Sequence, residues 1–207
     1  MVASRGSYRQ DWRGLDPTLP GLSTLAREGE AGRSWYAVAG ASVRAYAAEV
    51  GADPSFVAGV LAVTSPRVHV RWNAIYADHY IRTGTEHPRL MASVRAALRH
   101  YVATGEIRGP KTRAFRDALL GDPDAVVVDV WTGRALGALD EGRLEGKRYD
   151  AAADRIRRAA KRLRWTPAET QAAIWTGARA RFGHKPVDLL LPRSGTGGES
   201  TILESLD

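Results

Sequence analysis

Proline follows a helix-capping residue or a glycine at the start of four predicted helices, and this pattern constrains the fold most strongly. The four pairs are Asp53-Pro54, Ser65-Pro66, Gly109-Pro110 and Thr166-Pro167. Proline is favoured in the first turn of a helix, where its missing N–H has no intrahelical partner. The only strand-like run, at residues 126–128, is too short to build a sheet. The sequence therefore predicts an all-α fold.

Apolar residues recur with helical spacing between these signals, and several of the stripes end at a glycine. We expect helices over residues 34–50, 53–63, 65–82, 88–104, 111–120, from 129 onward, 149–163 and 166–182. The remaining segments contain many Gly, Pro and Ser residues and have no sustained period. The sequence thus predicts a loosely ordered arm at 1–33, a helical domain at 34–183 and a tail at 184–207.

The chain contains no cysteine. This excludes a disulfide framework, a thiolate nucleophile, a cysteine zinc site and a cysteine-held iron–sulfur cluster. The five histidines are scattered, with no pair at the spacing of a metal motif. No apolar run reaches the roughly 18 residues that a membrane span needs. We expect no metal, no other cofactor and no membrane, and a cytoplasmic or nucleoid-associated location.

The charge points to a polyanionic partner. There are 30 basic residues against 23 acidic ones, which gives a net charge of +7. Arginine accounts for 26 of the basic residues and lysine for only 4. One predicted helix is especially cationic, and its candidate DNA contacts are Arg157, Arg158, Lys161 and Arg162. A run of this kind is often only a solvated helix face, and it also suits phosphate contacts.

Residues 105–137 form the segment with the most chemical information. The Gly109-Pro110 turn leaves the first amides of the next helix without intrahelical partners, which suits a phosphate. Lys111 falls in that first turn, where the helix dipole disfavours its charged form. Asp129 follows four apolar residues and is placed to cap the next helix. Taken alone, Asp129 suits a simple cap and Lys111 a solvated helix residue.

Together these residues resemble the helix-hairpin-helix DNA glycosylases of the endonuclease-III-like superfamily. The resemblance rests on Gly109-Pro110-Lys111-Thr112 and on Val128-Asp129-Val130-Trp131 with Arg134, and Asp129 follows Lys111 by 18 residues (129 − 111). A weaker similarity lies at Leu61 to Pro66 with Trp72-Asn73, so the resemblance extends over about residues 35–182. Two features depart from the family: Ile107 replaces the first hairpin glycine, and the iron–sulfur loop is absent.

The resemblance implies a two-lobed helical domain that acts on duplex DNA. Lys111 would attack the sugar carbon and form a Schiff base, while Asp129 would stabilise the positive charge that develops on the deoxyribose. The hairpin contacts to DNA would come from Gly109, Thr112 and Arg113. The flipped base would stack on an aromatic side chain, for which the candidates are Trp72, Tyr76 and Trp131.

The sequence therefore predicts a DNA glycosylase that excises a damaged or modified base, with or without Schiff-base lyase activity. We expect it to act as a monomer on duplex DNA. Three alternatives remain open at this stage. They are a non-catalytic helix-hairpin-helix module that grips DNA, a base-modifying relative from a phage or mobile element, and a basic helical scaffold without a pocket.

Overall fold

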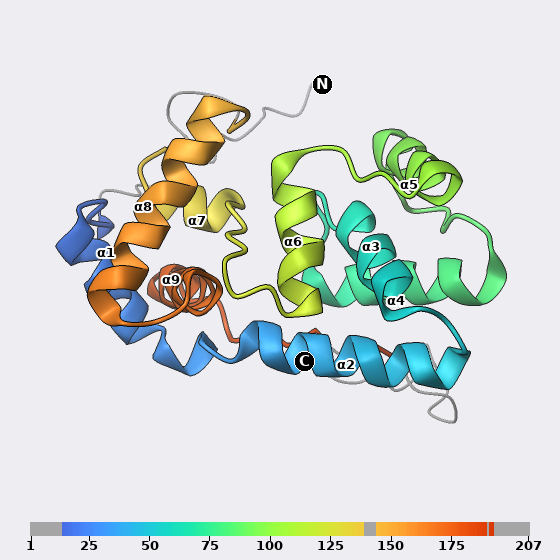
Figure 1. The fold of residues 1–207 in the computed structure, drawn as a ribbon, viewed down its shortest axis with the longest axis horizontal. Helices are drawn as coiled ribbons and strands as arrows, with labels where there is room; N and C mark the ends of the chain where they lie inside the picture. Colours follow the sequence, from blue (N-terminus) through green and yellow to red (C-terminus); the bar gives the residue numbers. More distant parts are fainter. Residues whose placement is uncertain (1–13, 139–143, 190, 193–207) are drawn as a thin grey trace, which may run out of the picture.

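The computed structural model describes residues 14–138, 144–189 and 191–192, and these residues form an all-helical fold without a strand (Figure 1). Its elements are α1 (Leu19–Glu28), η2 (Glu30–Gly32), α2 (Trp35–Val50), α3 (Pro54–Thr64), α4 (Val70–Thr83), α5 (Ala92–Thr104), α6 (Pro110–Leu120), α7 (Val130–Ala135), α8 (Lys147–Leu163) and α9 (Pro167–Arg181). The predicted all-α class is confirmed.

Local capping explains why three of these helices begin where the sequence predicts. The Asp53 carboxylate accepts hydrogen bonds from the backbone N–H groups of Ser55 and Phe56. Thr166 and Glu169 form a complete capping box, in which each side chain accepts from the other's backbone N–H. The Asp129 carboxylate caps α7 by accepting from the backbone N–H of Thr132. These contacts lie within a few residues of sequence, so the pattern alone is sufficient to locate them.

The predicted start of a helix at Ser65 is wrong. Ser65 is instead the C-cap of α3, and its hydroxyl donates to the carbonyl of Ala62 at 2.9 Å. Arg67 adopts a left-handed φ of 59°, which turns the chain before α4 begins after His69. The helix that was predicted to begin at Pro88 begins at Ala92 instead. The turn at 65–69 becomes part of the site described below.

The described helices pack around two apolar clusters, which we call the first and second lobes. The first lobe is built mainly by α2 to α6, and the second by α1 and α7 to α9. Figure 1 shows α2 running below both groups. Its aromatic residues Trp35 and Tyr36 begin the helix beside α9, while Val43 and Ala47 lie in the core of the first lobe. Helix α2 therefore joins the two lobes.

The short apolar run before Asp129 crosses from one lobe to the other. Ala125 and Val127 are buried in the first lobe, and Val126 and Val128 in the second. Alternate side chains of an extended segment point to opposite sides, which explains this division. Tyr149 of α8 fixes the segment, since its hydroxyl donates to the Val126 carbonyl at 2.8 Å and accepts from the Val128 N–H at 3.1 Å.

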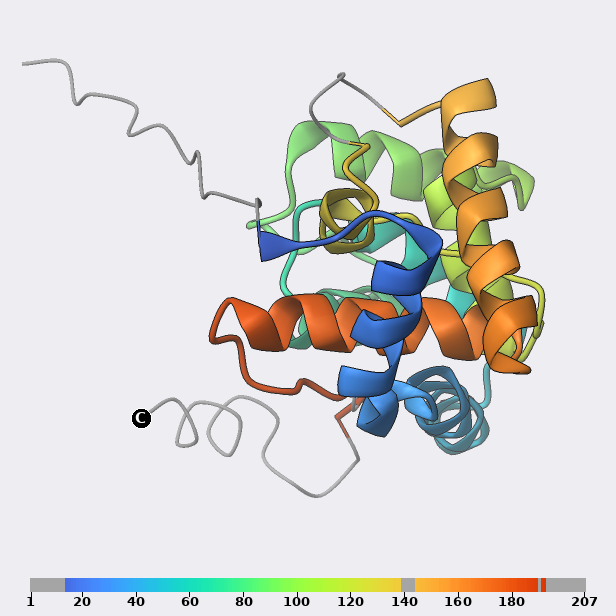
Figure 2. The ribbon, with the colours of Figure 1, turned by 90° about the vertical axis from the view of Figure 1, so that its left-hand side faces the viewer.

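The N-terminal segment differs from the predicted loose arm. Figure 2 shows α1 crossing α9, and Leu22 and Leu25 of α1 are fully buried or nearly so. Glycines permit this close approach: a Cβ on Gly29 would meet the backbone of α9, and a Cβ on Gly177 would meet the Leu25 carbonyl. Over residues 19–32 the expectation of a loose arm is wrong, and residues 1–13 lie outside the described part.

The predicted tail is packed over the part that the structure describes. Leu189 and Leu191 are buried in the first lobe, and the Leu191 N–H donates to the Ser42 hydroxyl at 3.3 Å. The Trp35 indole N–H donates to the Val187 carbonyl at 2.7 Å, which holds the segment against the start of α2. Residues 193–207, also assigned to the tail, lie outside the described residues.

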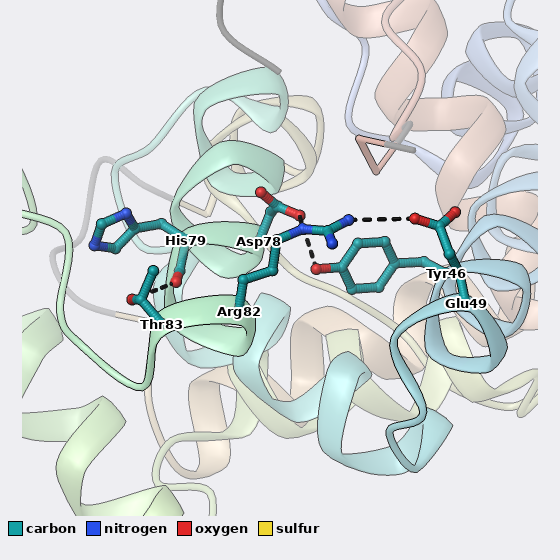
Figure 3. Close-up of polar contacts among 6 residues, drawn as sticks. All are labelled: Tyr46, Glu49, Asp78, His79, Arg82 and Thr83. Atoms are coloured by element: carbon teal, nitrogen blue, oxygen red, sulfur yellow. Dashed lines mark hydrogen bonds and ion pairs between the residues drawn. The ribbon is translucent and has the colours of Figure 1, made fainter. Parts of the chain in front are cut away.

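A polar network joins α2 to α4 on the first lobe (Figure 3). The carboxylate of Asp78 accepts from the Tyr46 hydroxyl at 2.8 Å and from Arg82 Nε at 2.6 Å. Arg82 also donates to Glu49 at 3.3 Å and lies over the ring of Tyr46. Burial, followed by the hydrogen bond to Asp78, raises the pKa of Tyr46 well above its ordinary value. The network fixes the position of α4, from whose first turns Val70 and Asn73 reach the site below.

Candidate active site

A cavity of about 260 Å³ lies where the two lobes meet. Its walls come from α2, α4, α6, α7, α9 and the crossing segment, and both predicted catalytic residues, Lys111 and Asp129, line it. The two residues lie on different sides of the cavity. Lys111 belongs to the first lobe, and Asp129 lies at the end of the crossing segment. The volume is slightly below the roughly 300 Å³ of the smallest drug-sized pockets, and it suits one small planar ring.

Lys111 projects into the cavity from the first turn of α6. Its Nζ donates to the hydroxyl of Ser65 at 3.1 Å. Because the Ser65 hydroxyl proton is directed to the carbonyl of Ala62, its oxygen is free to accept from the amine. Burial lowers the pKa of Lys111, and the negative charge of Asp129 opposes this shift. The environment thus favours a larger fraction of neutral amine than an exposed lysine has.

Asp129 uses both carboxylate oxygens to hold its position. Oδ1 accepts from the Thr132 N–H at 2.8 Å as the cap of α7, and Oδ2 accepts from the indole N–H of Trp175 at 2.9 Å. Both hydrogen bonds fix the orientation of the carboxylate. Asp129 is therefore a helix cap and also a fixed negative charge in the wall of the cavity.

A chain of buried hydrogen bonds forms another part of the wall. The Tyr36 hydroxyl donates to Gln171 Oε1 at 2.6 Å, and Gln171 Nε2 donates to the Thr132 hydroxyl at 2.9 Å. Burial, followed by the charge of Asp129, raises the pKa of Tyr36 well above its ordinary value. Tyr36 therefore stays a neutral donor, and the amide of Gln171 is held in one orientation.

Aromatic rings enclose the rest of the cavity. Trp35 lies 6.3 Å from Phe115 and 5.8 Å from Trp175, measured between ring centroids. Trp131, a predicted base-stacking residue, also lines the cavity. The other two candidates do not: Trp72 and Tyr76 stack on each other at 6.0 Å outside it. Their assignment to the pocket is wrong, because α4 presents Val70 and Asn73 to the cavity and carries these two rings on another face.

Several cavity residues were not identified from the sequence. Trp35 and Trp175 follow helical stripes that are typical of a core, and Gln171 and Arg179 belong to no motif. Ser65 was assigned only to a helix start and to the weaker similarity at Leu61 to Pro66. In the sequence, an apolar stripe that lines a cavity has the same spacing as one that packs in a core, so the two cannot be told apart. These side chains come together only because α9 packs against α2 at the edge of the first lobe.

The predicted DNA hairpin forms the connection between α5 and α6. Gly109 caps α6 with a left-handed φ of 87° and is exposed, as is Arg113, while Thr112 is partly exposed. Ile107, which stands where the family has its first glycine, is buried in the first lobe at 3% exposure. The side chain therefore anchors the hairpin, and the exposed amide end of α6 lies directly beside Lys111.

The cationic residues of α8 lie apart from the cavity. Arg157, Arg158, Lys161 and Arg162 are exposed, and none of them lines it. Helix α8 packs against α1 and α9, and Arg157 forms an ion pair with Asp154 at 2.8 Å. The structure thus joins Lys111, Asp129 and the hairpin in one place but does not bring the α8 cations to it.

The described part of the chain contains no candidate for a metal site or for a membrane span. No group of three or more His, Asp or Glu side chains there is placed to hold a metal ion. None of the helices in the same residues combines the length and apolar character that crossing a bilayer requires.

Comparison with known families finds one match. The model of a family of unknown function, DUF7178, matches residues 23–182. The chain belongs to the DUF7178 family. The matched range contains every residue that lines the cavity except His184, so the site lies within the DUF7178 region. No curated protein and no solved structure matches the chain.

Proposed function

We propose that this DUF7178 protein is a DNA base-excision glycosylase that receives a flipped nucleotide in the cavity between its lobes. The observation that carries the proposal is the shared position of Lys111 and Asp129 in one aromatic cavity. A neutral amine is a nucleophile, and a fixed carboxylate stabilises positive charge that develops nearby. The resemblance to the helix-hairpin-helix glycosylases, stated above from the sequence, assigns the same two residues to these roles.

The chemistry follows from the two environments. Lys111 Nζ forms a bond to C1′ of the deoxyribose as the bond from C1′ to the base nitrogen breaks. The base leaves with the electron pair of that bond and takes up one proton. The carboxylate of Asp129 lowers the energy of the cationic sugar during this step. Opening of the sugar ring then gives a Schiff base on Lys111, from which the strand can be cleaved by elimination.

The position of the hairpin supports DNA as the substrate. Gly109 exposes the first amides of α6 beside the cavity, and a helix N-terminus with free amides suits a backbone phosphate. Arg113 on the exposed face of α6 adds a positive charge next to it. A duplex held at this hairpin has its flipped nucleotide next to Lys111. The unstacking cost of a few kcal/mol would be offset by contacts to Trp35, Trp131 and Trp175.

The proposal is tested with a panel of duplex oligonucleotides, each with one altered base. We expect the full chain to release at least one of these bases, seen as strand cleavage after alkali. Lys111→Arg and Asp129→Asn should each reduce the single-turnover rate at least tenfold, about 1.4 kcal/mol of barrier. Strand binding without release of any base, or release that neither substitution affects, contradicts the assigned function and favours a DNA-binding module.

A further inference from the structure

Arg179 is a buried cation without an ion-pair partner among the described residues. It lines the cavity from α9 at 9% exposure, and no carboxylate of the described part forms a salt bridge with it. One Nη donates to the Lys185 carbonyl at 3.2 Å, and its guanidinium lies over the Trp175 ring at 4.4 Å. A buried charge with so little compensation is costly unless a ligand supplies the counter-charge.

Basic side chains outnumber acidic ones in the lining of the cavity. Lys111, His69, Arg179 and His184 line it, against the single carboxylate of Asp129. Both oxygens of that carboxylate already accept hydrogen bonds, from Thr132 and Trp175. Burial lowers the pKa of Arg179, and the negative charge of Asp129 opposes this shift without forming a salt bridge with the guanidinium.

The basic groups that accompany Arg179 lie at the mouth of the cavity. His69 and His184 are both exposed, and the ring of His184 meets the ring of Trp131 at 4.8 Å between centroids. Burial, followed by the nearby charge of Arg179, lowers the pKa of His69, and His184 adds a smaller contribution. Three chain segments, at 69, 179 and 184, thus bring basic groups to one side of the cavity.

We propose that Arg179, flanked by His69 and His184, binds the phosphate group of the nucleotide whose base occupies the cavity. This proposal rests on the proposed function, because it requires a base in the aromatic part of the site. The stacking of Arg179 on Trp175 and its bond to the Lys185 carbonyl fix the guanidinium plane. Its other N–H groups have no acceptor among the described residues, so they are available for phosphate oxygens.

The phosphate has two possible sources, the DNA backbone and a free nucleotide, and the test separates them. Binding is measured by tryptophan fluorescence and by the thermal midpoint of the full chain. The probes are a deoxynucleoside, its 5′-monophosphate and a duplex that contains a tetrahydrofuran abasic site. The variants are Arg179→Gln, Arg179→Lys and the matched control Arg44→Gln. Arg44 is exposed on α2 and does not line the cavity.

If a free nucleotide is the source, we expect the monophosphate to bind at least tenfold more tightly than the nucleoside, and Arg179→Gln to abolish this preference. If the backbone is the source, only the duplex binds, and Arg179→Gln weakens it at least tenfold relative to Arg44→Gln. Arg179→Lys keeps the charge without the planar fork, so it should retain part of the preference. It also provides the comparison if the Gln variant does not fold.

The inference is overturned if Arg179→Gln and Arg44→Gln bind every probe equally well. That outcome leaves the glycosylase proposal intact if bases are still released. Conversely, an Arg179-dependent preference for phosphate in a protein that releases no base supports the phosphate site and contradicts the glycosylase. An unliganded Arg179→Gln protein should keep its thermal midpoint, because the substitution removes a buried charge that has no salt bridge among the described residues. A phosphate preference that survives in a stable Gln variant would assign Arg179 a purely structural role.

Discussion

The carboxylate of Asp129 and the indole of Trp175 form a hydrogen bond of 2.9 Å between the start of α7 and the middle of α9. The bond fixes the carboxylate oxygen that the helix cap leaves unused. Trp175 is therefore a positioning residue for Asp129 as well as part of the aromatic wall.

Trp175→Phe should retain most of the ring contacts but remove the N–H donor. With one donor fewer, the carboxylate of Asp129 is less firmly held in its orientation. We expect the single-turnover excision rate to fall about tenfold, or about 1.4 kcal/mol, with a smaller change in the thermal midpoint. The matched control is Trp165→Phe, since Trp165 stacks on Arg33 and does not line the cavity. Equal rates for the two variants would contradict the positioning role.

Asp129→Asn has a structural consequence that the sequence alone does not predict. The Asn oxygen would keep the cap to Thr132, which turns its amide N–H₂ toward the N–H of Trp175. Two donors then face each other, and an unsatisfied buried donor costs about 1–3 kcal/mol. We expect Asp129→Asn to lower the free energy of unfolding and the double variant with Trp175→Phe to recover part of it. Excision should stay low in both, which separates the charge of Asp129 from its role in stability.

Lys111 and Asp129 could be identified from the sequence because their signals are local. A proline-initiated helix and a helix cap are each encoded within a few residues, and the spacing between them matches a known pattern. Gln171, Trp175 and Arg179 carry no such signal, since their place in the cavity depends on how α9 packs against α1 and α2. Helix α1 does carry a local signal, since Thr18 caps it and a proline lies in its first turn. Its docking, however, depends on the close approach of Gly29 to α9, which the sequence does not reveal.

Lys111→Arg should separate nucleophilic chemistry from charge. The guanidinium keeps the positive charge but is a very poor nucleophile, so DNA affinity should remain within about threefold while borohydride trapping is lost. Burial lowers the pKa of Lys111 from its ordinary value of 10.5. The trapping rate of the wild type should therefore rise with pH and level off below pH 10.5. Excision without any trapping would exclude Lys111 as the nucleophile and leave water as the attacking group.

Gly109→Val should weaken DNA binding with little loss of helix content. A Cβ at Gly109 approaches only the Thr112 hydroxyl, at 4.0 Å, so the substitution strains the backbone without a clash inside the protein. The new side chain would stand in front of the α6 amides. Gly105→Val is the matched control, because Gly105 also has a left-handed φ, of 73°, with open space around it, at the far end of the hairpin. If both variants bind DNA equally well, the α6 amides do not contact the duplex.

Tyr149→Phe should destabilise the segment that delivers Asp129. It leaves the buried Val126 carbonyl and Val128 N–H without their partner, and each unsatisfied group costs about 1–3 kcal/mol. Burial raises the pKa of Tyr149 from 10.0 to about 12, so the unfolded chain loses this proton first. Its contribution to stability is therefore complete below pH 10 and is lost between pH 10 and about 12. Urea titrations at several pH values should show a shallower alkaline decline in the Phe variant.

The α8 cations supply a test that does not depend on the cavity. Each protein–phosphate contact contributes about −0.9 to the slope of log affinity against log salt concentration. Replacing Arg157, Arg158 and Arg162 with Gln should make that slope shallower, with Arg157 contributing least because it is already paired with Asp154. Since none of the three lines the cavity, the single-turnover excision rate at saturating protein should not change. An unchanged salt slope would show that this face of α8 is only solvated and that the duplex is held at the hairpin alone.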